Sequence, residues 1–439
     1  MSAAVTDLAA LIGDLEDLLG PEAVSVDPTA RRVASTDWAH MSPILSAKLP
    51  AGLADVVAYP GTPEQIAGTV RLAHRHRVPV TPRGQGTGNY GQGIPLRDGL
   101  VVDTSRCARV LDIGPGWIRA EAGVSLAAIE AAARREGQEI AIMPSTVGSA
   151  IAGFIAGGSG GTGSIENGFT WDEYVHSMDI APCTDEGSLI TVDSGQCAPH
   201  IHAYGVTGVI ATATVTLVPK RDWIGLFASF AEEEAALAAA HELLRLDPAP
   251  RILSVDEPGV LETYPKDKAI PAGRFSVRAV IDRSSTTSAS RTVTCHGGTV
   301  EAVRDKGAAY LASLSFNHVT HRARKARPEL CHLQVHGEAL TTRPDEVRAV
   351  LPETLLHLDG FRVDRTAGVD GRGLVGMLLC RFDGADALYA GIEGLNAVGV
   401  EVHDPHTWLL HNDNLNEIRE AAQRFDPEGL LNPGKLPPS

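Results

Sequence analysis

The segment whose residue types most clearly suggest chemistry is a glycine-rich run that follows the short apolar stretch Val78-Pro79-Val80. It reads Arg83-Gly84-Gln85-Gly86-Thr87-Gly88. Glycines at alternate positions leave several backbone N–H groups unobstructed at one turn, where they can bind a diphosphate without a cation. The spacing nearly matches the dinucleotide fingerprint, but the residues that follow, up to Pro95, cannot continue as a helix. The run therefore predicts a diphosphate loop outside a Rossmann NAD site.

A second glycine-rich segment lies further along the chain, from Met143 to Gly163. It opens with Pro144-Ser145-Thr146-Val147-Gly148 and is too rich in glycine to be an ordinary core element. Two such loops in one domain predict a large, elongated ligand.

Histidines in the second half of the chain are the candidates for proton transfer. Asn317 and His318 lie in a polar stretch beside a predicted strand, and His403 lies in a histidine cluster before the last helix. An imidazole titrates near neutral pH, as a catalytic base requires. We predict His318 as the base, Asn317 as the group that orients it or the substrate, and His403 as a further candidate; hydrogen-bonded structural roles are the alternative.

Two other features have a functional and a structural interpretation. Arg381 ends a predicted strand and could face an acidic substrate, or it could be solvated or ion-paired. His332 and His336 share one face of a predicted strand, but the six scattered cysteines form no CxxC pair and no ligand spacing completes a metal site. We predict that the protein holds no metal.

The elements that must position the two glycine-rich loops alternate between strands and helices. Strands are predicted at residues 56–59, 78–80, 100–103, 117–122 and 209–218, and a hairpin around residues 185–187. Thr62 with the Pro and Gln that follow predicts the start of a helix, and Ser125 caps a second helix that ends at Gly137.

Beyond Pro219 the pattern changes to strands and helices without glycine-rich loops. Strands are predicted at residues 224–230, 274–281, 330–335 and 374–382, with helices at 232–246 and 386–398. This predicts an antiparallel sheet with helices on one face. The fold class is therefore α+β, with a ligand-binding domain at residues 1–220, a cap domain at 221–411 and a returning C-terminal segment at 412–439.

Composition limits the partners. The 439 residues carry a net charge of −16, which disfavours nucleic acid and anionic membranes. No apolar run approaches the roughly 20 residues that cross a bilayer. The first 19 residues form an amphipathic helix without the basic region of a signal peptide, so we expect a cytoplasmic location. Composition carries no information on oligomeric state.

Four blocks in order along the chain resemble the vanillyl-alcohol oxidase and p-cresol methylhydroxylase superfamily of FAD enzymes. They are the first glycine-rich loop, residues 144–148, residues 205–209 and the terminal stretch from Asp426 to Lys435. The resemblance implies that the N-terminal domain and the C-terminal tail hold FAD and that the middle domain covers the flavin. The cofactor-binding residues it implies are Arg83, Gly84, Gln85, Gly86, Thr87, Gly88, Asn89, Gln92, Pro144, Ser145, Gly148, Ser149, Ala152, Gly153, Gly208, Val209, Ile210 and Asn432.

The chain departs from parts of the family pattern. Members that attach FAD covalently carry His where this chain has Thr87, and bicovalent members carry Cys where it has Met143. Neither side chain can form the usual bond to the flavin, so we predict noncovalent FAD. The metal-binding segment of the D-2-hydroxyacid dehydrogenase subgroup is also missing from the cap.

The resemblance implies an FAD-dependent oxidase or dehydrogenase. Its substrate would be a small alcohol, hydroxyacid or amine that gives a hydride to the flavin, with O2 or another acceptor reoxidising the cofactor. A flavin-dependent lyase or synthase without net redox change, and a flavin-holding protein without activity, are the alternatives.

Overall fold

The computed structural model describes residues 8–438. Its first element is the amphipathic helix α1 (Leu8–Leu19), which buries Leu11, Leu15 and Leu19 and packs against α4 (Pro63–His76). Thr62 caps α4 through its side chain, as the sequence indicates. Residues 1–7 of the predicted N-terminal helix lie outside the described residues.

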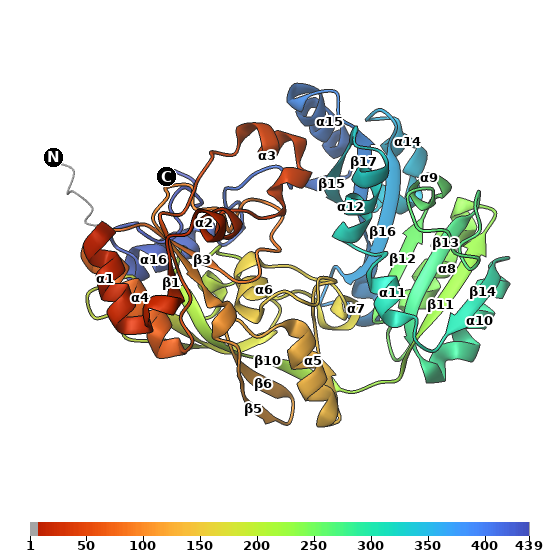
Figure 1. Ribbon diagram of the computed structural model, residues 1–439. Helices are drawn as coiled ribbons and strands as arrows, with labels where there is room; N and C mark the ends of the chain where they lie inside the picture. The colour runs from red at the N-terminus through yellow and green to blue at the C-terminus, as the bar shows by residue number, and fades with distance from the viewer. Residues whose placement is uncertain (1–7, 439) are drawn as a thin grey trace.

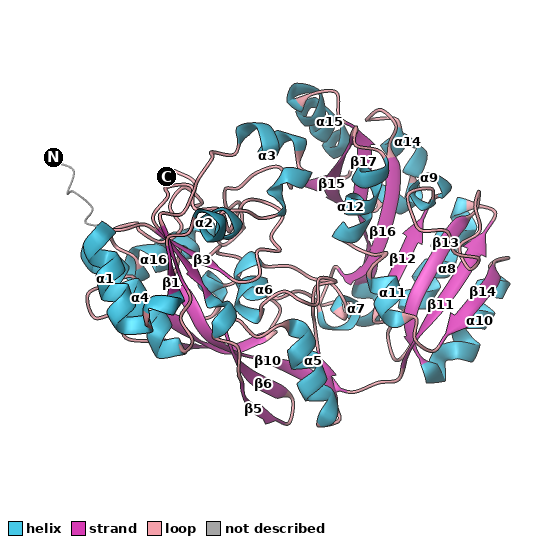
Figure 2. Cartoon of the chain, viewed as in Figure 1, coloured by secondary structure: helices cyan, strands magenta, loops and turns pink. Residues whose placement is uncertain are grey.

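The N-terminal half contains two sheets (Figure 2). The first has the order β1 (Val24–Ser25), β2 (Val56–Ala58), β4 (Leu100–Asp103) and β3 (Val80–Arg83), with β2, β4 and β3 parallel. The second is antiparallel and has six strands: β5 (Val110–Gly114), β6 (Trp117–Glu121), β10 (Val209–Pro219), β8 (Val175–Ala181) and β9 (Ile190–Asp193), with β7 (Gln138–Ile140) paired to β10.

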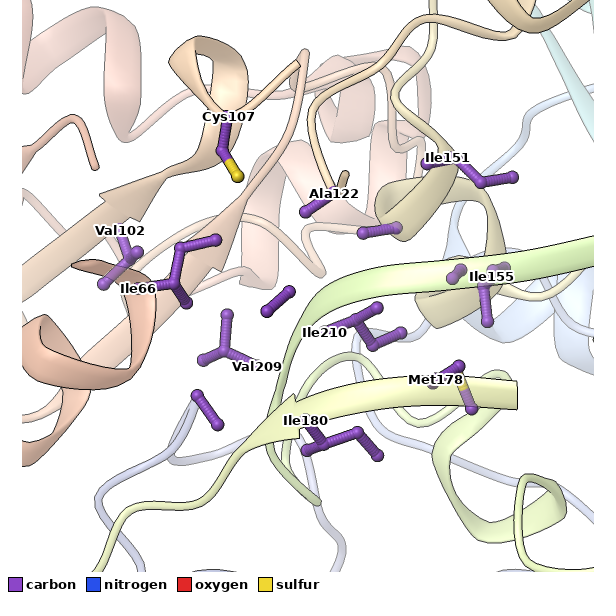
Figure 3. Close-up of a cluster of buried hydrophobic side chains, with 14 of the residues drawn as sticks. Ile66, Val102, Cys107, Ala122, Ile151, Ile155, Met178, Ile180, Val209 and Ile210 are labelled. Atoms are coloured by element: carbon purple, nitrogen blue, oxygen red, sulfur yellow. The ribbon is translucent and has the colours of Figure 1, made fainter. Parts of the chain in front are cut away.

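One hydrophobic core joins these two sheets. Figure 3 shows Ile66 of α4 and Val102 of β4 facing Val209 and Ile210, at the start of β10, across this core. Ile151 and Ile155, from α6 (Ile151–Gly157), pack into the same core. Their burial places α6 and the start of β10 next to the carboxyl ends of β3 and β4, where the first glycine-rich loop begins.

The second half of the chain forms one eight-stranded antiparallel sheet. Its order is β14 (Thr299–Arg304), β11 (Trp223–Phe230), β13 (Phe275–Asp282), β12 (Ile252–Asp256), β16 (Leu355–Arg362), β17 (Arg372–Arg381), β15 (Leu330–His336) and β18 (Glu401–His403). The fold class is confirmed as α+β. The sequence interpretation missed β12, β14, β16 and β18.

Helices cover both faces of this sheet, so the prediction of helices on one face is wrong. One face packs against α8 (Glu233–Leu244), α10 (Thr286–Cys295), α13 (Ala339–Thr342), α14 (Pro344–Arg348) and α15 (Ala385–Ala397). The other face packs against α9 (Pro258–Leu261), α11 (Ala308–Ala312) and α12 (Asn317–Ala326). The physical reason is that inner strands such as β11 are apolar at consecutive positions and must be covered on both sides.

The end of the chain returns to the N-terminal half (Figure 1). After α16 (Leu415–Phe425), Leu431 pairs with Val80 as an isolated bridge in parallel with β3, and the Asn432 N–H donates to the Val80 carbonyl at 2.6 Å. The division at residues 220 and 411 stays a prediction. Among the described residues, none of the helices has the length and apolar character needed to cross a membrane.

Candidate cofactor and substrate site

A cavity lies in the N-terminal half, where β3, α6 and the start of β10 meet. Twelve predicted cofactor residues line it: Arg83, Gly84, Gln85, Gly86, Thr87, Gly88, Gln92, Ala152, Gly153, Gly208, Val209 and Ile210. The structure therefore brings the first glycine-rich loop and the residues at the start of β10 together around one space.

Six predicted cofactor residues do not line this cavity: Asn89, Pro144, Ser145, Gly148, Ser149 and Asn432. Ser149 is one contact away, because its hydroxyl lies 2.8 Å from that of Thr87, a lining residue. The Asn432 side chain donates to the carbonyls of Gln92 and Tyr204 at 2.8 and 2.7 Å, so it links two segments that line the cavity. Ser145 instead faces the cap.

Two glycines are required by the shape of the cavity wall. Gly86 has φ +64°, and a Cβ there would lie 2.0 Å from Arg83 Nη2. Gly208 has φ +127°, and a Cβ there would lie 2.2 Å from Ile180 Cγ2. Side chains at these positions would strain the backbone and fill the wall against which a ligand must lie. These glycines leave the backbone accessible, as a diphosphate loop requires.

Two charged residues of this region were missed by sequence reasoning. Asp37 lines the cavity and is buried; its Oδ1 accepts from the Ala39 N–H, while Oδ2 has no hydrogen-bond partner among the described residues, and burial raises the pKa of the carboxyl. Lys435 lies fully buried beside it and donates to the Gly91 carbonyl. Burial lowers the pKa of Lys435 to about 7. Nothing in the sequence around Asp37 marks it, because only the tertiary fold brings residues 37 and 435 together.

The lining of the cavity fits the chemistry of FAD. Its glycine-rich wall supplies backbone N–H groups for a diphosphate, and Arg83 is occupied elsewhere, donating from Nη1 to the Thr36 carbonyl at 2.8 Å. The unpartnered Oδ2 of Asp37 is an acceptor for a ligand hydroxyl. The residues present therefore suit a long ligand with a diphosphate and hydroxyl groups.

The cap contacts both glycine-rich loops through the first residues of α12. Asn317 faces the hydroxyl of Tyr90, which also accepts from Gln334 Nε2 at 2.5 Å. His318 lies beside the backbone of Ser145 in the second loop. The predicted catalytic pair, Asn317 and His318, thus lies where the cap meets the loops of the N-terminal half.

Buried polar atoms without partners gather on α12 and on the neighbouring strand β15. They are Asn317 Oδ1, Thr320 Oγ1, Arg324 Nη1 and both ring nitrogens of His332. His332 and Gln334 share one face of β15, and Gln334 contacts Tyr90, so this face is directed towards the first loop. Buried polar groups normally have partners, and such a group of exceptions points to a missing polar ligand.

The histidines of this region are held in the neutral form. Burial lowers the pKa of His318, lowers that of His321 to about 4 and lowers that of His332 well below its ordinary range. Burial also lowers the pKa of Arg324, whose Nη1 has no hydrogen-bond partner among residues 8–438. Neutral imidazoles can accept a proton, and an unpaired guanidinium can bind an anion.

Other predicted residues lie outside this arrangement. His403 Nε2 lies 3.1 Å from His411 Nε2, and burial lowers the pKa of His403 to about 4. Arg381 pairs with Asp383 and Glu353, which matches its ion-paired interpretation. His336 pairs with Glu401. Within residues 8–438 no three His, Cys, Asp or Glu side chains are grouped so that they could hold a metal ion.

Residues 54–193 match the FAD binding domain family. Over 205 residues the chain is 27% identical to an uncharacterized FAD-linked oxidoreductase of Mycobacterium tuberculosis, and the match covers 45% of each chain. It is 32% identical over 202 residues to glycolate oxidase subunit GlcD of Escherichia coli, covering 43% of this chain and 40% of the relative. The chain thus matches less than half the length of these relatives.

Two further comparisons extend over most of the chain. Glycolate oxidase subunit GlcD of Bacillus subtilis is 24% identical over 426 residues, covering 87% of this chain and 88% of the relative. A solved structure of alkyldihydroxyacetonephosphate synthase matches with a TM-score of 0.77 at 14% identity, covering 99% of this chain and 86% of that one. The second likeness shows the fold.

Proposed function

We propose that this chain, whose residues 54–193 match the FAD binding domain family, is an FAD-dependent oxidoreductase of small hydroxy acids. FAD, when bound, supplies the hydride acceptor. The residues of this chain hold the cofactor, bind the substrate and accept the hydroxyl proton.

The predicted attachment of FAD is noncovalent. Thr87 lines the cavity and its hydroxyl lies 2.8 Å from that of Ser149. The histidine on the cavity wall, His200, is engaged with the Thr207 hydroxyl at 2.9 Å. Precipitation with acid should therefore leave the flavin in the supernatant, whereas yellow colour retained in the washed pellet would show a covalent bond.

We infer the substrate class from Arg324, which lies on α12. Arg324 is half-buried, its Nη1 has no hydrogen-bond partner among residues 8–438, and it lies next to the unpartnered nitrogens of His332, so this position favours an anion. A carboxylate satisfies both groups, and an arginine can bind it in a bidentate way. Two relatives are named for glycolate and for D-lactate, and each of these compounds carries such a carboxylate beside its hydroxyl group.

We assign the proton step to the histidines beside this anion site. His318 lies beside the Ser145 backbone, and because burial lowers its pKa its neutral imidazole can accept the hydroxyl proton. Asn317, held against Tyr90, would orient the hydroxyl group. His332 is a second candidate for the base, while the position of His403, against His411, supports no step for it.

The proposal is tested by adding substrates to the FAD-loaded protein without oxygen. Short 2-hydroxy acids should bleach the flavin, and their uncharged amides should fail, because only the acids pair with Arg324. Bleaching by acid and amide alike would remove Arg324 from the substrate site. The alternative function is that of a flavin-dependent lyase or synthase without net redox change, on the fold that this chain shares with the synthase. That function predicts bleaching by neither compound. O2 or another electron acceptor, and a cytoplasmic location, remain part of this proposal.

A further inference from the structure

A buried charged network crosses the middle of the cap sheet. His357 Nδ1 lies 2.6 Å from Asp256 Oδ1, and its Nε2 lies 2.7 Å from Asp359 Oδ2. Arg278 pairs with the other oxygen of Asp256. The four residues are at most 3% exposed. Since an imidazole between two carboxylates donates from both nitrogens, His357 is an imidazolium, and two cations balance two anions.

This network holds three consecutive residues that lead directly into α12. Arg278 Nη2 donates to the Leu314 carbonyl at 3.1 Å. The Ser315 hydroxyl lies 2.8 Å from that of Ser254, which in turn donates to Asp359 at 2.6 Å. The Phe316 N–H donates to Asp359 Oδ2 at 2.9 Å. The chain is therefore fixed at each position just before Asn317 and His318.

The backbone at Phe316 shows why such a hold is needed. Its φ is +56°, a conformation that residues with a side chain rarely adopt and that surrounding contacts must maintain. No side chain caps the N-terminus of α12. The direction in which α12 leaves the sheet, and so the place of its first two residues, depends on these contacts from Asp359 and Arg278 rather than on a helix cap.

We propose that His357 and Asp359 are positioning residues that set the N-terminus of α12 against the two glycine-rich loops. His357 fixes Asp359, Asp359 fixes the Phe316 N–H, and the turn at Phe316 aims Asn317 at Tyr90 and His318 at Ser145. The catalytic consequence rests on the proposed function, whereas the structural consequence does not. A network that serves only stability would leave the place of α12 unchanged when it is weakened.

Trp38 reports the place of α12 without any substrate. Its ring lies 5.2 Å from that of His321, which is on α12, in an edge-to-face arrangement. Fluorotryptophan incorporated into the FAD-loaded full chain gives one fluorine NMR signal for each tryptophan, and a Trp38→Phe variant assigns the signal of Trp38. Trp117, which lies on β6 of the N-terminal half, is the internal reference.

The test compares two variants of the network with a matched control. His357→Gln and Asp359→Asn should each shift the Trp38 signal and leave that of Trp117 in place. Glu257→Gln weakens another buried ionic contact of the cap, with Arg348, that does not touch residues 314–316, and it should leave the Trp38 signal unchanged. If His357→Gln does not fold, Asp359→Asn decides the outcome by the same signal.

Activity supplies a second readout. At saturating hydroxy acid the rate of flavin reduction should fall about tenfold or more in both network variants, since a misplacement of about 1 Å can cost roughly 100-fold. Their FAD content should not change. An unmoved Trp38 signal in a variant that is merely less stable overturns the proposal, as does a shifted signal with an unchanged rate. A protein that no hydroxy acid reduces refutes the proposed function, while the NMR comparison still decides the position of α12.

Discussion

Single residues in the substrate region differ in what they can do because they differ in partners. Arg381 already has two carboxylates, so it offers nothing to a ligand, whereas Arg324 Nη1 has no hydrogen-bond partner among residues 8–438. His403 contacts another histidine, whereas His318 lies beside the second glycine-rich loop. Position in the sequence did not separate these pairs; their three-dimensional partners do.

Arg324→Met should weaken binding of a 2-hydroxy acid by about 10- to 100-fold, because hydrogen bonds to charged groups contribute about 1.5–3 kcal/mol. The measurement is the concentration of acid that gives half-maximal bleaching of the flavin without oxygen. Lys325→Met is the matched control, since Lys325 is the next residue on α12, is exposed and carries the same charge. Equal effects of the two variants would mean that only the general charge of the helix matters.

His318→Ala should lower the rate of flavin reduction by about 10²- to 10⁴-fold while FAD stays bound, as expected for loss of a general base. Rapid mixing with saturating hydroxy acid measures this rate. His296→Ala is the control, because His296 pairs with Glu242 on the far side of the cap sheet. A near-normal rate in His318→Ala would transfer the role to His332.

Some functional features are predictable from local sequence, whereas others arise only when helices and strands distant in the sequence pack together. The loop at residues 83–88, the strand pattern 100–103 and the caps at Thr62 and Ser125 were predictable, because turn glycines, capping residues and apolar runs are local signals. Asp37, Lys435 and the face of β15 with His332 were not, since each acquires its meaning only from residues distant in sequence. The missed strands β12 and β16 are buried, and short apolar runs of this kind do not reveal their period.

The C-terminal segment should contribute to cofactor affinity as an element. Asn432→Ala removes two hydrogen bonds to cavity segments, and at roughly 1 kcal/mol each it should raise the Kd for FAD by about tenfold or more. Titration of FAD into the apoprotein, followed by quenching of flavin fluorescence, measures this. Asn414→Ala loses one long surface hydrogen bond of 3.3 Å and should bind FAD normally. An equal loss of FAD affinity in both variants would contradict a specific role for Asn432.

For the whole molecule, two buried basic side chains, His357 and Lys435, make the free energy of unfolding change with pH in opposite directions. Asp256, Asp359, Arg278 and nearby Tyr264 surround His357, and the two carboxylates raise its pKa to about 10. The stability this gives is complete below the unfolded pKa of about 6.5 and is lost as pH rises through 10. Lys435 has a lowered pKa of about 7, so its burial costs stability until it loses its proton, and stability rises between pH 7 and about 10.5.

These opposite slopes predict opposite behaviour of two variants between pH 7 and 9. Relative to the unchanged protein, His357→Gln should become progressively less destabilised as pH rises, by up to about 1.4 kcal/mol per pH unit. Lys435→Met should show the reverse trend. Urea unfolding midpoints at pH 7, 8 and 9 measure both, and parallel curves for all three proteins would contradict the assigned protonation states.

We propose that this chain holds FAD between its two glycine-rich loops and reduces it with a hydride from a hydroxy acid bound at Arg324. The most direct measurement is the flavin absorbance of the FAD-loaded protein during titration with glycolate and D-lactate in the absence of oxygen. Full bleaching by at least one of them, with oxidised flavin restored on addition of an electron acceptor, is the predicted result. A protein that takes up FAD but stays fully oxidised with both acids would contradict the account.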